Sequence, residues 1–183
     1  MKIRISLLLA LTLALSGCGQ AESTEDTWSD AVRIEFSDDS VTVDGNAASA
    51  DSAVYTENDI IFYLEGQGVT YGEGTEADAH SQAEADAHTV VHITQPGTYV
   101  LSGELSAGQI AVDLGEGAET DPEAVVTLVL DGVDITCTVA PAVMFYRVYE
   151  CGSTDGDAAS WEVDTSAAGA NIMIADGTEN TIR

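Results

Sequence analysis

Acidic side chains are the most numerous groups in this sequence that could do chemistry, and several flank predicted strands. Asp113, Glu116 and Asp121 follow one apolar run, and Asp131 and Asp134 follow the next. Calcium takes six to eight oxygen ligands from carboxylates, carbonyls and water, so carboxylates at the ends of neighbouring strands are candidate calcium ligands. Their spacing is not that of an EF-hand loop, and a solvated acidic surface that keeps the protein soluble is the alternative interpretation.

A second group of potential metal ligands contains histidines. One short segment holds Asp78, His80, Glu84, Asp86, His88 and His92. Imidazole and carboxylate are zinc-type ligands. However, His88 and His92 flank a predicted strand, in which residues four apart lie about 13 Å from each other. One ion cannot bridge that distance unless the chain bends, so we expect ordinary loop histidines here.

No catalytic motif supports an enzymatic interpretation. The sequence has no G-x-S-x-G nucleophile elbow. Its Gly115-Glu116-Gly117 turn lies in an acidic run that would repel a phosphate. A glycoside hydrolase needs only two carboxylates at a suitable separation, but no motif selects such a pair. We therefore expect that the protein is not an enzyme.

The charge balance narrows the range of partners. Lys and Arg total five against 32 Asp and Glu, which gives a formal net charge of −27. Nucleic acid is excluded as a partner because phosphate binding is driven by Lys and Arg. The same argument disfavours an anionic membrane surface. The charge balance still allows three kinds of partner: cations, neutral ligands, and anionic ligands that arrive with a bridging cation.

The N-terminus has the features of an export signal. Lys2 and Arg4 precede the apolar run Ile5–Leu15, which is too short to span a bilayer and is typical of a secretory signal. Leu15-Ser16-Gly17-Cys18 resembles a bacterial lipobox. This resemblance implies that residues 1–17 are removed and that Cys18 is lipidated. Residues 18–30 then form a flexible tether, and we expect an exported lipoprotein anchored to the membrane at the bacterial cell surface.

Two further cysteines lie in the folded region. Cys137 and Cys151 are a candidate disulfide pair, since an exported protein experiences an oxidising environment. Two buried free thiols on neighbouring strands are the alternative. The sequence gives no geometry that separates these possibilities.

Short runs rich in Val, Ile, Thr and Tyr predict an all-β domain over residues 31–183. A weak internal repeat pairs residues 109–113 with 142–146, and residues 127–135 with 171–178. Such a repeat favours a β-solenoid, whose coils stack on one another. The alternative is a β-sandwich with a hairpin at each Asp-Gly pair, since this dipeptide suits a tight turn.

Residues 91–138 resemble a bacterial exported family of carbohydrate-binding domain-containing proteins. The similarity lies in residues 93–105 (ITQPGTYVLSGEL), 108–113 (GQIAVD) and 126–136 (VTLVLDGVDIT), and again in 174–182 (IADGTENTI). The resemblance implies a right-handed parallel β-helix like that of pectate lyases, with bound calcium. Members of this family continue for many more coils, so the chain resembles a member truncated at its C-terminus.

The same resemblance implies non-catalytic binding of a polysaccharide, either acidic or from plant cell walls. A domain this acidic would repel an acidic glycan unless calcium bridged the carboxylates on both sides. A neutral glycan would instead need exposed aromatic rings, for which Trp161 and Tyr146 are candidates, although burial in the core is the ordinary role of such residues. The alternatives are a structural or adhesive surface lipoprotein and a truncated polysaccharide-degrading enzyme.

Overall fold

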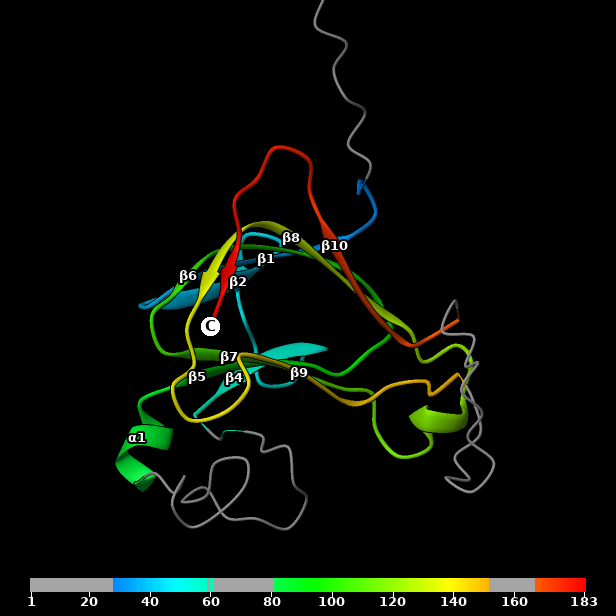
Figure 1. Cartoon of the computed structure of the whole chain (residues 1–183), viewed down its shortest axis with the longest axis horizontal. Helices are drawn as coiled ribbons and strands as arrows, with labels where there is room; N and C mark the ends of the chain where they lie inside the picture. The colour runs from blue at the N-terminus through cyan, green and yellow to red at the C-terminus, as the bar shows by residue number, and fades with distance from the viewer. Residues whose placement is uncertain (1–27, 59, 61–80, 152–166) are drawn as a thin grey trace, which may run out of the picture.

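The computed structural model describes residues 28–58, 60, 81–151 and 167–183, which form two β-sheets (Figure 1). Sheet A has the strand order β10-β8-β6-β1-β2-β3, with β11 also paired to β8. Its strands are β1 (Val32–Ser37), β2 (Ser40–Val43), β3 (Asn46–Ala47), β6 (Gly97–Leu105), β8 (Val126–Ile135), β10 (Ala170–Ile174) and β11 (Thr181–Ile182). Sheet B has the order β4-β5-β7-β9. Its strands are β4 (Val54–Glu57), β5 (Thr89–Ile93), β7 (Gly108–Asp113) and β9 (Val143–Arg147).

From β5 to β10 the chain alternates between the sheets. β5, β7 and β9 pair in parallel in sheet B, and β6, β8 and β10 pair in parallel in sheet A. The pairs β1–β2, β2–β3 and β4–β5 are antiparallel, so both sheets are mixed. The predicted all-β class is confirmed, and two mixed sheets are compatible with the sandwich alternative as well as with a solenoid.

One core lies between the two sheets (Figure 1). In β1 the apolar and polar residues alternate, so Ile34 and Phe36 are buried while Glu35 is exposed. β5 and β7 are different, because almost every residue in them is buried. Continuous burial is typical of parallel strands that are covered on both faces.

The predicted repeat corresponds to strands that are parallel neighbours. Ile110 pairs with Val143, and Val126 pairs with Ala170. The predicted hairpin at Asp131-Gly132 is wrong, since β8 runs through this dipeptide. Instead, the register between β6 and β8 shifts here by one residue, as in a β-bulge, and Gly132 has a φ of 80°.

Gly103 lies opposite this bulge, where the backbones of β1 and β6 approach each other closely. It pairs with Phe36 of β1 and has a φ of 103°. A Cβ atom at this position would overlap the Phe36 carbonyl oxygen. Only glycine therefore allows β1 and β6 to pair here.

Some elements were not predicted from the sequence. β3, β4 and β11 are short, and residues 72–87, a small, polar and acidic stretch with the composition of a loop, contain helix α1 (Gln82–Asp86). Ser81 and Glu84 form a capping box at its start, which is the sequence signal for a helix in this segment. The run at residues 59–64 (DIIFYL), whose composition is typical of a strand, lies outside the described residues apart from Ile60. Within the described residues, no helix is long and apolar enough to span a membrane.

Candidate functional site

Asp113, predicted as a metal ligand, forms an ion pair in the structure. It lies at the end of β7, where Arg147 of β9 donates to both carboxylate oxygens, from Nε at 2.6 Å and from Nη2 at 2.5 Å. Gly115 also donates its backbone N–H to Asp113. Partial burial acts to raise the pKa of Asp113, but these hydrogen bonds and the charge of Arg147 outweigh it, so the pKa lies below the usual value.

The other predicted metal ligands lie apart from this pair. Glu116 and Asp121 belong to the exposed connection between β7 and β8, whereas Asp131 and Asp134 belong to β8 of sheet A. Asp134 accepts a hydrogen bond from Arg183 at 3.2 Å. Among the described residues, no three His, Cys, Asp or Glu side chains are grouped so that they could hold one metal ion. Protein side chains alone therefore supply no complete calcium site in this part of the chain.

The remaining predicted residues have different surroundings. Cys137 and Cys151 are free thiols in the structure, and burial raises the pKa of the Cys137 thiol. Tyr146 is half-buried, and the Arg147 guanidinium lies 5.3 Å from the centre of its ring. Trp161 lies outside the described residues.

One face of sheet B combines aromatic rings with charged groups. Tyr55 of β4 pairs with His92 of β5, and their rings are stacked with centroids 4.6 Å apart. Glu57 lies two residues after Tyr55, with its carboxylate 3.9 Å from His92. Asp113 is on the same face because it lies two residues beyond Ala111, the partner of His92 in β7. We call this set of four residues the Tyr55 face.

The Tyr55 face can offer hydrogen bonds to a polar ligand, and its half-buried Tyr55 ring can contact a ligand ring, whereas His92 is buried. Burial raises the pKa of Tyr55, as do the charges of Glu57 and Asp113, so its hydroxyl stays protonated and able to donate. Arg147 is partly exposed beside Asp113 and presents a flat cation. Spacing along the chain does not indicate that Tyr55 and His92 meet, because 37 positions separate them and β4 was not predicted.

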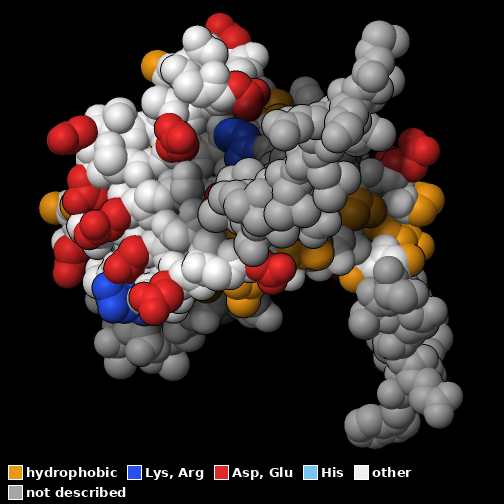
Figure 2. Space-filling view, turned by 90° about the horizontal axis from the view of Figure 1, so that it is seen from above, with side chains coloured by type: hydrophobic (Ala, Val, Ile, Leu, Met, Phe, Trp, Pro, Cys, Tyr) orange, Lys and Arg blue, Asp and Glu red, His pale blue; other side chains and the backbone are white. Residues whose placement is uncertain are grey.

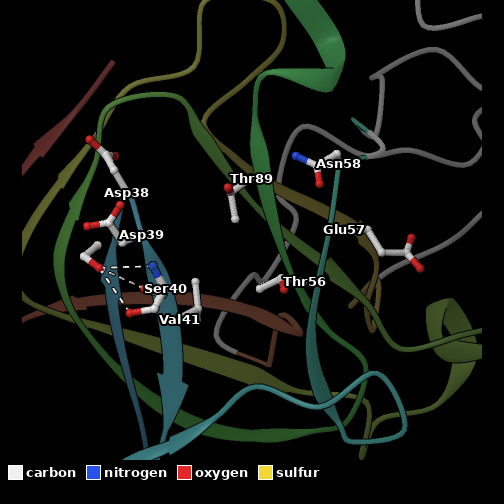
Figure 3. A pocket seen from close by; sticks show the side chains of 9 residues that line it. Asp38, Asp39, Ser40, Val41, Thr56, Glu57, Asn58 and Thr89 are labelled. Atoms are coloured by element: carbon white, nitrogen blue, oxygen red, sulfur yellow. Dashed lines mark hydrogen bonds between the residues drawn. The ribbon is translucent and has the colours of Figure 1, made fainter.

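A small polar pocket lies on the other side of β4 (Figure 3). Its volume is about 160 Å³, and it opens between the β1–β2 turn and the ends of β4 and β5. In Figure 3, Thr56 and Thr89 lie between these elements, while Glu57 projects away from the hairpin. We call it the hairpin pocket. Sequence reasoning missed it because Asp38-Asp39 only indicates a turn.

Hydrogen bonds from other segments fix both walls of the hairpin pocket. Asp38 accepts from the backbone N–H and the hydroxyl of Ser106, each at 2.7 Å. These bonds lower the pKa of Asp38. On the opposite wall, Asn58 donates to the carbonyl oxygens of Asp86 at 3.0 Å and His88 at 2.8 Å. The pocket is therefore formed before any ligand arrives.

Comparison with known proteins gives one match. No curated protein and no solved structure matches the chain. Residues 87–154 match a family model described as carbohydrate-binding domain-containing protein, which supports at family level the resemblance seen in the sequence. This segment runs from the start of β5 past the end of β9, so His92, Asp113, Tyr146 and Arg147 lie in the part of the chain that is similar to that family.

Proposed function

We propose that this protein binds polysaccharide without catalysing a reaction, as an exported lipoprotein anchored through Cys18 at the bacterial cell surface. The observation that carries the proposal is the family match over residues 87–154. The structure adds a reason to place binding on the Tyr55 face. The half-buried Tyr55 ring, a partly exposed guanidinium and carboxylates are groups that can contact the faces and hydroxyls of sugars.

The strands from β5 to β10 would be the first coils of a right-handed parallel β-helix. Their alternation between two sheets and the parallel pairing within each sheet support this architecture. The handedness follows from the rule that parallel strands joined by a crossover are almost always connected in the right-handed sense.

The glycan is acidic or comes from plant cell walls, and calcium takes part in its binding. The formal charge of −27 makes direct contact with a uronate polymer unfavourable, and Figure 2 shows carboxylates over much of the visible described surface. Calcium would have to bridge the two sides, with carboxylates of the protein on one and carboxylates of the glycan on the other. Such a bridge accounts for incomplete coordination by protein side chains alone.

Affinity electrophoresis of the full chain tests this function. Gels loaded with polygalacturonate or xylan would be run with calcium and again with chelator. We expect polygalacturonate to slow the protein only with calcium, and Arg147→Ala to weaken that retention. Arg33→Ala is the matched control, since it removes a cation from β1 of sheet A.

Three results would count against parts of the proposal. Full retention of the protein in gels with chelator would show that binding does not require calcium. Absence of retention in every gel, from protein shown to be folded, would overturn polysaccharide binding in favour of an adhesive role. Release of new reducing ends from the polymer would show that the protein is an enzyme.

A further inference from the structure

The hairpin pocket excludes several classes of ligand by its charge. Arg and Lys are absent from the residues that line it, whereas Asp38, Asp39 and Glu57 are among them. A phosphate or a uronate carboxylate would meet only negative charge there. The pocket therefore does not suit the acidic sugars of the proposed calcium-bridged glycan.

A divalent cation is also a poor fit. Both oxygens of Asp38 already accept hydrogen bonds from Ser106. The carboxylate of Glu57 projects away from the hairpin (Figure 3) and lies 3.9 Å from His92. Asp39 is then the one lining carboxylate left for an ion. Calcium needs six to eight oxygen ligands, so one carboxylate beside hydroxyls makes a weak site.

The groups that remain suit an uncharged ligand with many hydroxyls. Thr56 and Thr89 each offer a hydroxyl that can donate and accept. The amide of Asn58 uses its nitrogen for Asp86 and His88, which leaves its oxygen as an acceptor. Because hydrogen bonds to other segments hold these walls, little ordering would be required when a ligand binds.

Size limits the ligand further. Pockets for drug-sized molecules span about 300–1,000 Å³, and the hairpin pocket is about 160 Å³. We infer that it binds a single neutral sugar ring, as the end or a side branch of a glycan. This inference rests on the proposed function. It adds a second subsite, which lies across edge strand β4 from Tyr55 and His92 and shares Glu57 with the Tyr55 face.

Titration of the ¹⁵N-labelled full chain with methyl glycosides tests the inference by NMR. The probes are the methyl glycosides of glucose, galactose and xylose, with galacturonate and calcium chloride as separate arms. We expect at least one neutral glycoside to shift the amide signals of residues 37–41, 56–58 and 89 to saturation. Galacturonate without calcium should bind these residues at least tenfold more weakly.

Isosteric variants identify the groups responsible. Thr56→Val and Thr89→Val should each raise the dissociation constant about fivefold, which is the effect of one neutral hydrogen bond. Thr127→Val makes the same change in β8, away from the pocket, and should leave binding unchanged.

The outcomes separate the pocket from the proposed function. If no glycoside shifts the pocket signals, or if calcium chloride alone saturates them, the sugar subsite is wrong. An equal loss in Thr127→Val would also overturn it. If the sugar subsite fails in this way but a polysaccharide gel still retains the wild type, the proposed function stands. If the wild type shows neither NMR shifts at the pocket nor retention in the gel, the subsite and the proposed function are both wrong.

Discussion

β7 and β10 are similar strands with opposite surroundings. Both contain isoleucine and pair in parallel with a neighbour, but Ile110 of β7 is fully buried, while Ile172 and Ile174 of β10 are 52% and 68% exposed. β7 lies between β5 and β9, whereas β10 is an edge strand of sheet A. Packing therefore stabilises β7, and hydrogen bonds to β8 hold β10. The difference shows that apolar composition alone does not reveal which strands form the core.

After β10, the side chain of Asn180 connects the chain to β8 by hydrogen bonds. Asn180, just before β11, accepts from the backbone N–H groups of Gly132 at 3.0 Å and Val133 at 2.8 Å. It also donates to the Thr178 hydroxyl. Its amide thus occupies the place opposite the β8 bulge where backbone pairing is interrupted between β10 and β11.

Among these substitutions, Gly103→Ala in β6 is expected to lower the free energy of unfolding the most. The new Cβ would overlap the Phe36 carbonyl and force β1 away from β6. We expect the free energy of unfolding to fall by more than about 4 kcal/mol, or the protein not to fold. Urea denaturation followed by circular dichroism measures this. Gly45→Ala is the control, since Gly45 has a φ of 74° but open space around it, so the loss there should be about 1 kcal/mol.

The same substitution in the two strands tests the comparison directly. Ile110→Ala should cost about 2–5 kcal/mol because it leaves a cavity in the core. Ile174→Ala should change stability by no more than about 0.5 kcal/mol because its side chain is already in solvent. Both values come from urea denaturation curves. Similar losses in the two variants would mean that β10 is covered in solution.

Asp113→Asn should have a smaller effect that depends on pH. Removing the charged partner of Arg147 should lower stability by about 1–2 kcal/mol at neutral pH. The folded pKa of Asp113 lies below the usual 3.8, so its contribution is complete above that value. The contribution is lost as the pH falls through the folded pKa, and the gap between wild type and variant should then close.

Denaturation at pH 7, 5 and 3 measures this gap. Asp134→Asn serves as the comparison, because its ion pair with Arg183 is largely exposed and should contribute little. A gap for Asp113→Asn that stayed constant down to pH 3 would refute the linkage to the ion pair.

The smallest effect is expected at the end of sheet A, from Asn180→Ala. It should lower global stability by about 1 kcal/mol or less, because the freed N–H groups of Gly132 and Val133 can bond to water. Amide hydrogen exchange should nevertheless become faster at these two residues. Unchanged exchange there would mean that the Asn180 side chain does not protect the bulge.

Most strands could be predicted from the sequence because buried strands contain alternating or continuous runs of apolar residues. Sequence analysis missed β4 because Val54–Glu57 is short and contains one strongly apolar residue, and its partner β5 lies more than 30 positions away. It also interpreted Asp131-Gly132 as a turn, although neighbouring strands on both sides keep β8 extended. Local propensity cannot contain that tertiary constraint.

The candidate site was less predictable for the same reason. The sequence predicts Asp113 as a candidate metal ligand, but it does not reveal the ion pair with Arg147, which lies 34 positions later. The hairpin pocket depends on Ser106 and Asn58, which hold its walls across long sequence separations. Spacing along the chain gives no measure of such contacts.

Backbone hydrogen bonds near the two ends of the connection between β9 and β10 make this protein a suitable host for grafted peptides. Gly97 of β6 pairs with Val126 of β8, 29 positions later, yet Val126 pairs with Ala170 of β10 after 44 positions. Tyr149 donates to Ala124, and Gly169 donates to Tyr149, so both ends of the longer connection are tied to the same corner. Loop-closure entropy grows only slowly with length. A foreign epitope or enzyme recognition sequence inserted between Tyr149 and Gly169 could therefore be displayed without altering the strand register.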